Sequence, residues 1–191
     1  MSSVPRHRYT VEEYLDFERG SDSKHEYYAG EIFAMVGASE PHVLIVTNVV
    51  IELGSQLKGR RCKVYSNDMR LKVGPTGLYT YPDVMAVCGE AEFDDAQFDT
   101  LLNPNVVIEA FSPSTEDYDR GAKFEHCRRV PSLTDYVLIS QSTRRVEHYS
   151  RQADGGWLLT EVTAADGVVQ LKSIGCELRL GDIYDKIDLP G

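Results

Sequence analysis

The stretch VVIEAFSPST, residues 106–115, decides the fold predicted for this chain. It begins as a continuous apolar run of the kind found in buried strands, and its Ser-Pro end is typical of a break in secondary structure. Glu109 stands in the middle of this run. A buried carboxylate is costly unless it meets a cation, accepts hydrogen bonds or shifts its pKa, so we expect a polar site beside this strand.

Similar apolar runs on both sides of this stretch predict further strands. We expect core strands in CKVYSNDMRLKV, YPDVMAVCG and DYVLIS, which are residues 62–73, 81–89 and 135–140. The segments VEHYSRQ, WLLTEVT and VVQLKSIGCELRL are joined by the turn sequences ADGG and AADG. They predict a C-terminal antiparallel meander at about residues 144–182.

Helices are predicted on both sides of these strands. Thr10 with Glu13 forms a capping-box pattern that begins a short helix. The segment HVLIVTNVVIELGSQLKG predicts a largely buried helix, with Ser39 or Glu40 near its N-cap and Pro41 in its first turn. TEDYDRGAKFEHCRR predicts a third helix, and EYYAGEIFAMVG predicts a pair of short strands. The fold class is therefore α/β, with a mixed central β-sheet flanked by helices.

Length and composition are those of an ordinary globular protein. The chain has 191 residues, of which 42% are hydrophobic and 26% charged. We expect a single domain over residues 1–191, with its core at about residues 9–140. No segment resembles a signal peptide, and no apolar stretch approaches the roughly 18 residues that a membrane span needs. These features predict a cytoplasmic protein without a membrane partner.

Charge and cysteine usage limit the functional classes. The net charge of −10 discourages non-specific attraction to polyanions and counts against a nucleic-acid partner. Basic islands at residues 58–63, 126–129 and 143–145 leave a local basic face open. The four cysteines lie far apart without a CxxC pattern, which favours four buried or half-buried thiols over a zinc site.

A second acid stands at the start of another apolar run, where Asp83 follows Tyr81-Pro82. Mg²⁺ takes oxygen ligands, usually one or two carboxylates together with water and substrate phosphate. A cation held by Asp83 and Glu109 would stabilise both carboxylates and would serve the hydrolysis of a phosphodiester. The two acids therefore predict a divalent-metal site for Mg²⁺ or Mn²⁺.

The residues around these acids carry a family resemblance. Pro82-Asp83 followed by Glu109 is similar to the PD-(D/E)XK nuclease superfamily. The ordered set TVEEYLDFE, KHEYYAGEIFAM, YPDVMAV, VVIEAFSPST and DYVLIS resembles, more narrowly, the Uma-two family of proposed restriction endonucleases. The resemblance implies a restriction-endonuclease-like core and a Mg²⁺-dependent endonuclease site for DNA, with Asp83 and Glu109 as metal ligands. It also implies a homodimer, because nucleases of this fold often pair to cut two strands.

The chain departs from the superfamily pattern at one position. A lysine is expected two residues after the glutamate, and this chain has Phe111 there. In the Uma-two family the lysine is found in the helix after the strand, which maps onto Lys123. The resemblance implies that Lys123 orients the attacking water or stabilises charge. It also implies that Glu26, in KHEYYAG, approaches the metal as a further catalytic residue.

Purely structural roles stay open for three of these residues. Asp83 could be a solvated residue at the start of a strand. Glu109 could form a structural ion pair with Arg120 or Lys123, and such a pair is weak evidence for either stability or activity. Lys123 could instead pair with Asp119, four residues before it on the same helix.

Other polar residues have ordinary interpretations. Glu26 could be an exposed carboxylate beside its basic neighbours in KHEYYAG. His42, at the start of a predicted helix, is interpreted as a packing or capping residue rather than a general base. Asp68 is interpreted as a turn or surface residue. Ser112 and Ser114 have no base at a recognisable spacing, which argues against a serine hydrolase.

Two further functional classes stand beside a metal-dependent endonuclease. One is a catalytically silent module of the nuclease fold that binds nucleic acid or protein, which the net charge of −10 and Phe111 both favour. The other is a phosphoesterase for small substrates, which suits an acidic surface. Metal binding separates the silent module from the enzymes, because only an enzyme needs two carboxylates poised for a cation.

Overall fold

The N-terminal region of the computed structural model, which describes residues 7–35 and 37–189, contains a helix and a hairpin. Helix α1 (Val11–Arg19) begins at Thr10, and both hydrogen bonds of the capping box with Glu13 are present. Strands β1 (His25–Tyr28) and β2 (Glu31–Ala34) follow as an antiparallel pair. The predicted helix and hairpin are confirmed.

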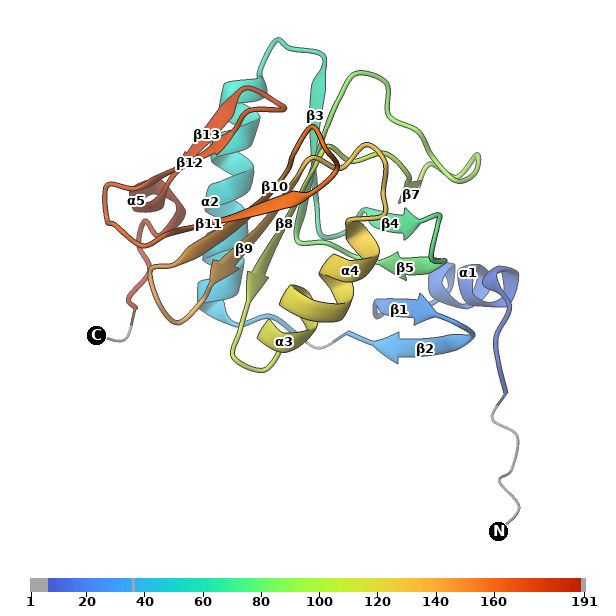
Figure 1. Cartoon of the computed structure of the whole chain (residues 1–191). Helices are drawn as coiled ribbons and strands as arrows, with labels where there is room; N and C mark the ends of the chain where they lie inside the picture. The colour runs from blue at the N-terminus through green and yellow to red at the C-terminus, as the bar shows by residue number, and fades with distance from the viewer. Residues whose placement is uncertain (1–6, 36, 190–191) are drawn as a thin grey trace.

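The long helix α2 (Glu40–Leu57) covers one face of the larger sheet. Ser39 is its N-cap and a proline stands in its first turn, as predicted. Ile45, Val49 and Leu53 are fully buried. Figure 1 shows α2 behind the sheet and the helical segment that contains α3 and α4 in front of it.

The larger sheet has six strands in the order β11-β10-β9-β8-β6-β3. Only β8 and β9 are parallel, and the other neighbours are antiparallel, so the predicted mixed sheet is confirmed. The strands are β3 (Cys62–Ser66), β6 (Val84–Cys88), β8 (Val106–Phe111), β9 (Asp135–Ser140), β10 (Val146–Arg151) and β11 (Trp157–Val162).

A second sheet has five strands in the order β2-β1-β5-β4-β7. Its remaining strands are β4 (Arg70–Val73), β5 (Leu78–Thr80) and β7 (Thr100–Leu101). The prediction of one continuous strand over residues 62–73 is wrong, because a turn follows Ser66 and sends β3 and β4 into different sheets. Residues 81–83 also lie outside a strand, since a proline cannot donate to a ladder.

The helical segment after β8 is predicted correctly in extent but not in type. It consists of α3 (Glu116–Tyr118), the π-helix η1 (Asp119–Lys123) and α4 (Phe124–Cys127). A π-helix widens each turn and is frequent at functional sites. Here the widened turns form the part of the segment that contains Lys123.

The C-terminal strands are antiparallel, as predicted, but they do not form one meander. Strands β10 and β11 extend the larger sheet, while β12 (Val168–Leu171) and β13 (Cys176–Arg179) form a separate hairpin. Gln56 attaches this hairpin to α2, because its side-chain amide exchanges hydrogen bonds of 2.7 and 2.9 Å with the backbone of Glu177. A short helix, α5 (Leu180–Ile183), ends the fold.

Strand β8 divides the core into two parts. Ile108 and Ala110 pack on the side of α2, whereas Val107 and Phe111 belong to the cluster on the opposite face, which also contains Cys127 of α4. The alternation of side chains along a strand places Glu109 on this second face. The carboxylate therefore points away from α2, toward the π-helix.

One cysteine prediction is wrong. Cys62 and Cys88 are register partners on β3 and β6 and form a disulfide, rather than two free thiols. The pairing depends on a strand register that residue spacing alone does not reveal. Cys127 and Cys176 are buried free thiols, as expected.

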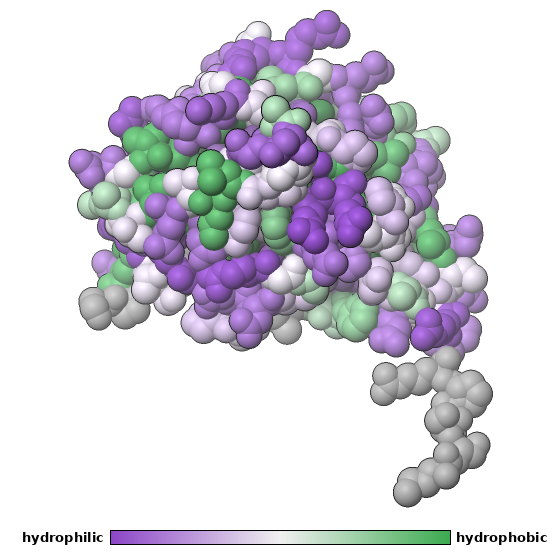
Figure 2. Space-filling view, viewed as in Figure 1, coloured by the Kyte–Doolittle hydropathy of each residue, from purple (hydrophilic) through white to green (hydrophobic). Residues whose placement is uncertain are grey.

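The surface has no dominant apolar face in the view of Figure 2. That face is mostly hydrophilic and is interrupted by separate hydrophobic areas. Scattered exposed apolar side chains are ordinary in globular proteins. Within residues 7–35 and 37–189, no helix has both the length and the apolar character needed to cross a membrane.

Candidate active site

Asp83 and Glu109 meet at the edge where β6 begins. The register pairs Val84 with Ile108, so the preceding residue Asp83 lies beside Glu109. The backbone amide of Asp83 donates to Oε2 of Glu109 at 3.4 Å, and the amide of Ala110 donates to Oδ2 of Asp83 at 2.7 Å. Asp83 is 9% exposed and Glu109 is 3% exposed. The interpretation of Asp83 as a solvated strand start does not fit this burial.

Lys123 reaches the same place from the π-helix. Its Nζ lies 2.8 Å from Oε1 of Glu109, 3.7 Å from Oε1 of Glu26 and 3.9 Å from Oδ1 of Asp119. Burial by itself would lower the pKa of Lys123, but Glu109 and the other carboxylates outweigh it and hold that pKa well above its ordinary value. The lysine is therefore a buried cation.

Burial has the opposite effect on the acids around this cation. It raises the pKa of Glu109 well above its ordinary value, and the Lys123 ammonium opposes that rise. Burial also raises the pKa of Asp119, again against the effect of Lys123. Asp119 is thus a fourth acid of the site, although the sequence indicated it only as a helical partner of Lys123.

Glu26 enters the site from β1. Its Oε1 accepts a hydrogen bond from Thr80 Oγ1, and its Oε2 accepts one from the hydroxyl of Tyr118 at 2.7 Å. The side chain is 13% exposed, which excludes the interpretation of Glu26 as an exposed carboxylate. Partial burial and the Glu26 carboxylate raise the pKa of Tyr118. The tyrosine therefore stays protonated and donates to Glu26.

His42 belongs to the site, which its packing or capping interpretation missed. Its Nε2 lies 3.1 Å from Oδ1 of Asp83, and its Nδ1 lies 3.0 Å from the carbonyl oxygen of Ala110. Both of these oxygens are acceptors, but the amide nitrogen of Gln141 also lies 3.1 Å from Nδ1, so Nδ1 carries a proton only when it donates to Ala110. The hydrogen bond with Asp83 raises the pKa of His42 despite burial. No spacing in the sequence links these residues, because they come from different elements.

Asp68 lies apart from this group of residues. It stands in the turn between β3 and β4, and Lys24 Nζ lies 2.6 Å from its Oδ1. The Asp68 side chain is 82% exposed. This position agrees with its interpretation as a turn or surface residue.

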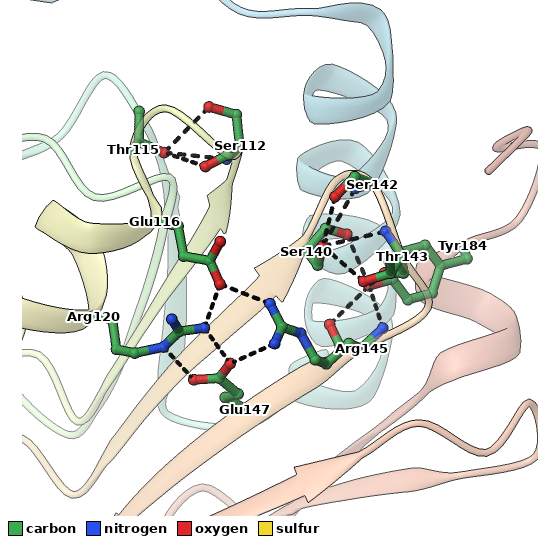
Figure 3. A network of polar contacts seen from close by, with 10 residues as sticks. All are labelled: Ser112, Thr115, Glu116, Arg120, Ser140, Ser142, Thr143, Arg145, Glu147 and Tyr184. Carbon is green, nitrogen blue, oxygen red and sulfur yellow. Dashed lines mark hydrogen bonds and ion pairs between the residues drawn. The ribbon is translucent and has the colours of Figure 1, made fainter. Parts of the chain in front are cut away.

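A partly exposed network of ion pairs holds the π-helix against β10 (Figure 3). Glu147 of β10 accepts hydrogen bonds from Nε and Nη2 of Arg120 at 3.0 and 2.6 Å. Oε1 of Glu116 bridges Arg120 and Arg145 at 2.6 and 2.8 Å. Arg120 is thus engaged away from Glu109, and it fixes the helical segment three residues before Lys123.

Two arginines of the network also contact Phe111, which occupies the position where the superfamily pattern has a lysine. The Phe111 ring has the guanidinium of Arg120 at 5.8 Å and that of Arg145 at 5.6 Å from its centre. Such contacts are favourable cation–π interactions. Phe111 therefore has a packing role, and Lys123 is the only lysine within ion-pair distance of Glu109 in the described part of the chain.

The donor set suits a hard divalent cation. Oε1 of Glu109 is buried and accepts no hydrogen bond of ordinary geometry from the described residues, although the Lys123 ammonium lies 2.8 Å away. Within the same residues there is no cluster of three or more His, Cys, Asp or Glu side chains arranged as metal ligands. Mg²⁺ needs only one or two carboxylates, with water and substrate completing its shell, so Asp83 and Glu109 fit it.

Known proteins are similar to this chain in sequence or in architecture. Two uncharacterized proteins of Synechocystis are similar: one is 37% identical over 95% of this chain and 94% of its own length. The other is 35% identical over 84% of this chain and 91% of its own length. A crystal structure from Anabaena variabilis, described as "a putative nuclease belonging to DUF820", superposes with a TM-score of 0.76. It has 19% sequence identity and covers 92% of this chain and 97% of that chain, which shows a shared fold.

The family assignment rests on nearly the whole length of the chain. The profile of the Uma2 (Uma-two) family, described as "Putative restriction endonuclease", matches residues 11–181. This range contains every candidate residue of the site. The chain therefore belongs to the Uma2 family.

Proposed function

We propose that this protein is a metal-dependent endonuclease that hydrolyses DNA phosphodiester bonds with Mg²⁺ or Mn²⁺. One observation carries the proposal: Asp83, Glu109 and Lys123 come from three separate segments of the chain and meet in one buried group. Membership of a family described as restriction endonucleases supports the same reaction class. Fold alone would not, since one fold hosts many activities.

The carboxylates and the lysine have separable roles in this proposal. Asp83 and Glu109 would hold the cation, which supplies Lewis acidity toward the phosphate and activates the attacking water. Lys123, kept cationic by the surrounding acids, would donate hydrogen bonds to the water or to the phosphate oxygens. Glu26 would hold the Lys123 ammonium and the Tyr118 hydroxyl in place.

The direct test is nicking of supercoiled plasmid in Mg²⁺, in Mn²⁺ and in EDTA. We expect nicking by the wild type with either cation, and its loss in Asp83→Asn and Glu109→Gln. Asp68→Asn is the matched control, because it removes one acid that is exposed and outside the site. Equal nicking by Asp83→Asn and the wild type would show that another protein, such as a contaminating nuclease, causes it.

Calorimetric titration of the same cations separates the alternatives. A silent module would give neither metal binding nor nicking. A phosphoesterase for small substrates would bind the metal and cleave a phosphodiester such as bis(p-nitrophenyl) phosphate while leaving plasmid intact. The net charge of −10 is the observation that favours this alternative.

The proposed homodimer is tested by sedimentation equilibrium, where a monomer at micromolar concentration would contradict it.

A further inference from the structure

His42, at the start of α2, contacts the Asp83 carboxylate in a place largely removed from water. Its Nε2 lies 3.1 Å from Oδ1 of Asp83, and the two side chains are 17% and 13% exposed. Burial limits competition from water, so this hydrogen bond is stronger than one on the surface. The roles proposed above for the carboxylates and the lysine do not use it.

The other nitrogen of the His42 ring faces a side chain from the end of β9. Gln141 directly follows β9, and its Nε2 lies 3.1 Å from Nδ1 of His42 and 2.8 Å from the carbonyl oxygen of Ala110. Oε1 of Gln141 accepts a hydrogen bond from Ser39 Oγ at 2.7 Å. Ser39 is also the N-cap of α2. The His42 ring is thus held both by its own helix and by the residue after β9.

These contacts determine the direction of each hydrogen bond. The carbonyl oxygen of Ala110 only accepts, so the Gln141 atom beside it is the amide nitrogen, which has two protons to donate. One proton serves Ala110 and the other serves Nδ1, so the neutral His42 ring carries its own proton on Nε2. When the ring takes up a second proton, Nε2 keeps the first. Donation to Asp83 therefore persists in both states of the ring.

The Asp83 carboxylate is held at both of its oxygens. Oδ1 accepts from His42, and Oδ2 accepts from the backbone amide of Ala110 at 2.7 Å. Each carboxylate oxygen has two lone pairs, so one on each oxygen stays for a cation. The two bonds fix the plane of the carboxylate beside Glu109, whose Oε2 accepts from the backbone amide of Asp83 at 3.4 Å.

We propose that His42 is a positioning residue, which orients Asp83 for the cation. Gln141 holds the His42 ring for this purpose, and Ser39 holds the Gln141 amide. Asp83 is a metal ligand in the proposed function, on which this role of His42 rests. His42 does not bind the cation itself, because its Nε2 proton points at Asp83 and its Nδ1 faces the Gln141 amide. Hydrogen bonds that orient a metal ligand raise the affinity of a site for its metal.

The test measures the dissociation constant of Mn²⁺ by calorimetry and the melting temperature of the same samples without metal. His42→Leu should weaken binding by about 10–100-fold, as for loss of other partners that orient a metal ligand. His42→Gln should restore most of the affinity, because its amide nitrogen reaches the position of Nε2. Gln141→Leu should weaken binding about fivefold, which is the effect of one neutral hydrogen bond.

His148→Leu is the matched control. Nε2 of His148 also lies close to an aspartate, at 2.7 Å from Oδ1 of Asp135, and its side chain is 11% exposed, but neither residue belongs to the site. This variant should lower the melting temperature without changing the dissociation constant. Equal Mn²⁺ affinity of His42→Leu and the wild type would overturn the role of His42 and leave the proposed function intact. Absence of binding in the wild type would overturn both.

The metal-free wild type supplies a further readout if His42→Leu does not fold. Long-range ¹H–¹⁵N spectra show which ring nitrogen carries a proton, and we expect Nε2 of His42 to be protonated. A ring protonated only at Nδ1 cannot donate to Asp83 and would overturn the proposal. A loss of affinity that His42→Gln does not restore would also overturn it, since the imidazole would then act through its shape alone.

Discussion

The Nζ atom of Lys123 lies 2.8 Å from Oε1 of Glu109, and both side chains are almost completely removed from water. The carboxylates around Lys123 keep its ammonium charged, and the ammonium opposes the effect of burial on the pKa of Glu109, so loss of Lys123 leaves Glu109 without a charged partner. The stability of the fold is thus linked to two residues to which we assign hydrolysis.

Lys123→Met should destabilise the metal-free protein by about 3–5 kcal/mol, because Glu109 is then buried without a cation. The double variant Lys123→Met/Glu109→Gln should recover part of this loss, since neither charge remains. Urea denaturation of the wild type, both single variants and the double variant measures the coupling. A double variant that loses the sum of the two single losses would show that the pair is not coupled.

Glu147 should matter for the site although it contacts none of the proposed ligands. Glu147→Gln removes the carboxylate that accepts two hydrogen bonds from Arg120 (Figure 3). The ion pair with the Arg120 guanidinium, whose side chain is 35% exposed, is then weakened, and we expect a loss of about 1–2 kcal/mol in the free energy of unfolding. Because Arg120 fixes the segment that carries Lys123, nicking at a temperature where the variant is fully folded should also fall.

The control for this prediction is Glu125→Gln, on the same helical segment. Glu125 is exposed and forms no ion pair among the described residues. The free energy of unfolding of Glu125→Gln should therefore match that of the wild type within about 0.5 kcal/mol, and its nicking rate should equal that of the wild type. Equal behaviour of the Glu147 and Glu125 variants would mean that the network does not position the π-helix.

The sequence predicts well what is encoded locally. The capping box at Thr10, the hairpin before α2 and the apolar run of β8 are each specified by neighbouring residues, and each forms as predicted. The candidate residues Asp83, Glu109, Lys123 and Glu26 came from ordered motifs, and the fold brings them together. Their catalytic roles stay predictions.

Features that depend on distant pairing could not be predicted. His42 meets Asp83 only because α2 begins beside the start of β6, and the network of Arg120 depends on the position of β10. The π-helix widens the turns before Lys123, and Gly121 within it does not by itself signal that type of turn. Residue type and spacing do not contain strand register, which is set when the sheet assembles.

The Cys62–Cys88 disulfide determines how many free thiols the unfolded protein presents to a thiol reagent. In denaturant without reductant, a thiol reagent should titrate two groups, Cys127 and Cys176, and after reduction it should titrate four. The variant Cys62→Ser/Cys88→Ser should lose about 3 kcal/mol, because the cross-link restricts the unfolded chain. Four reactive thiols in protein purified without reductant would contradict the pairing, and Cys127→Ser provides the control for the count.

Arg19 and Asp99 should make the stability depend on pH below 4. The hydrogen bond from Arg19 lowers the pKa of Asp99 to about 2, against about 3.9 in an unfolded chain. A lowered pKa in the folded state contributes stability that is present above pH 4 and is lost as the pH falls through about 2. Since the carboxylate is a third exposed, solvent screening limits this contribution to about 1 kcal/mol.

Asp99→Asn should therefore lower the free energy of unfolding by about 1 kcal/mol at pH 7 and by progressively less below pH 4, in urea titrations across this range. Asp22→Asn, at an exposed acid outside this pair, should show no such pH-dependent difference from the wild type, and a constant difference for Asp99→Asn would contradict the role of Arg19.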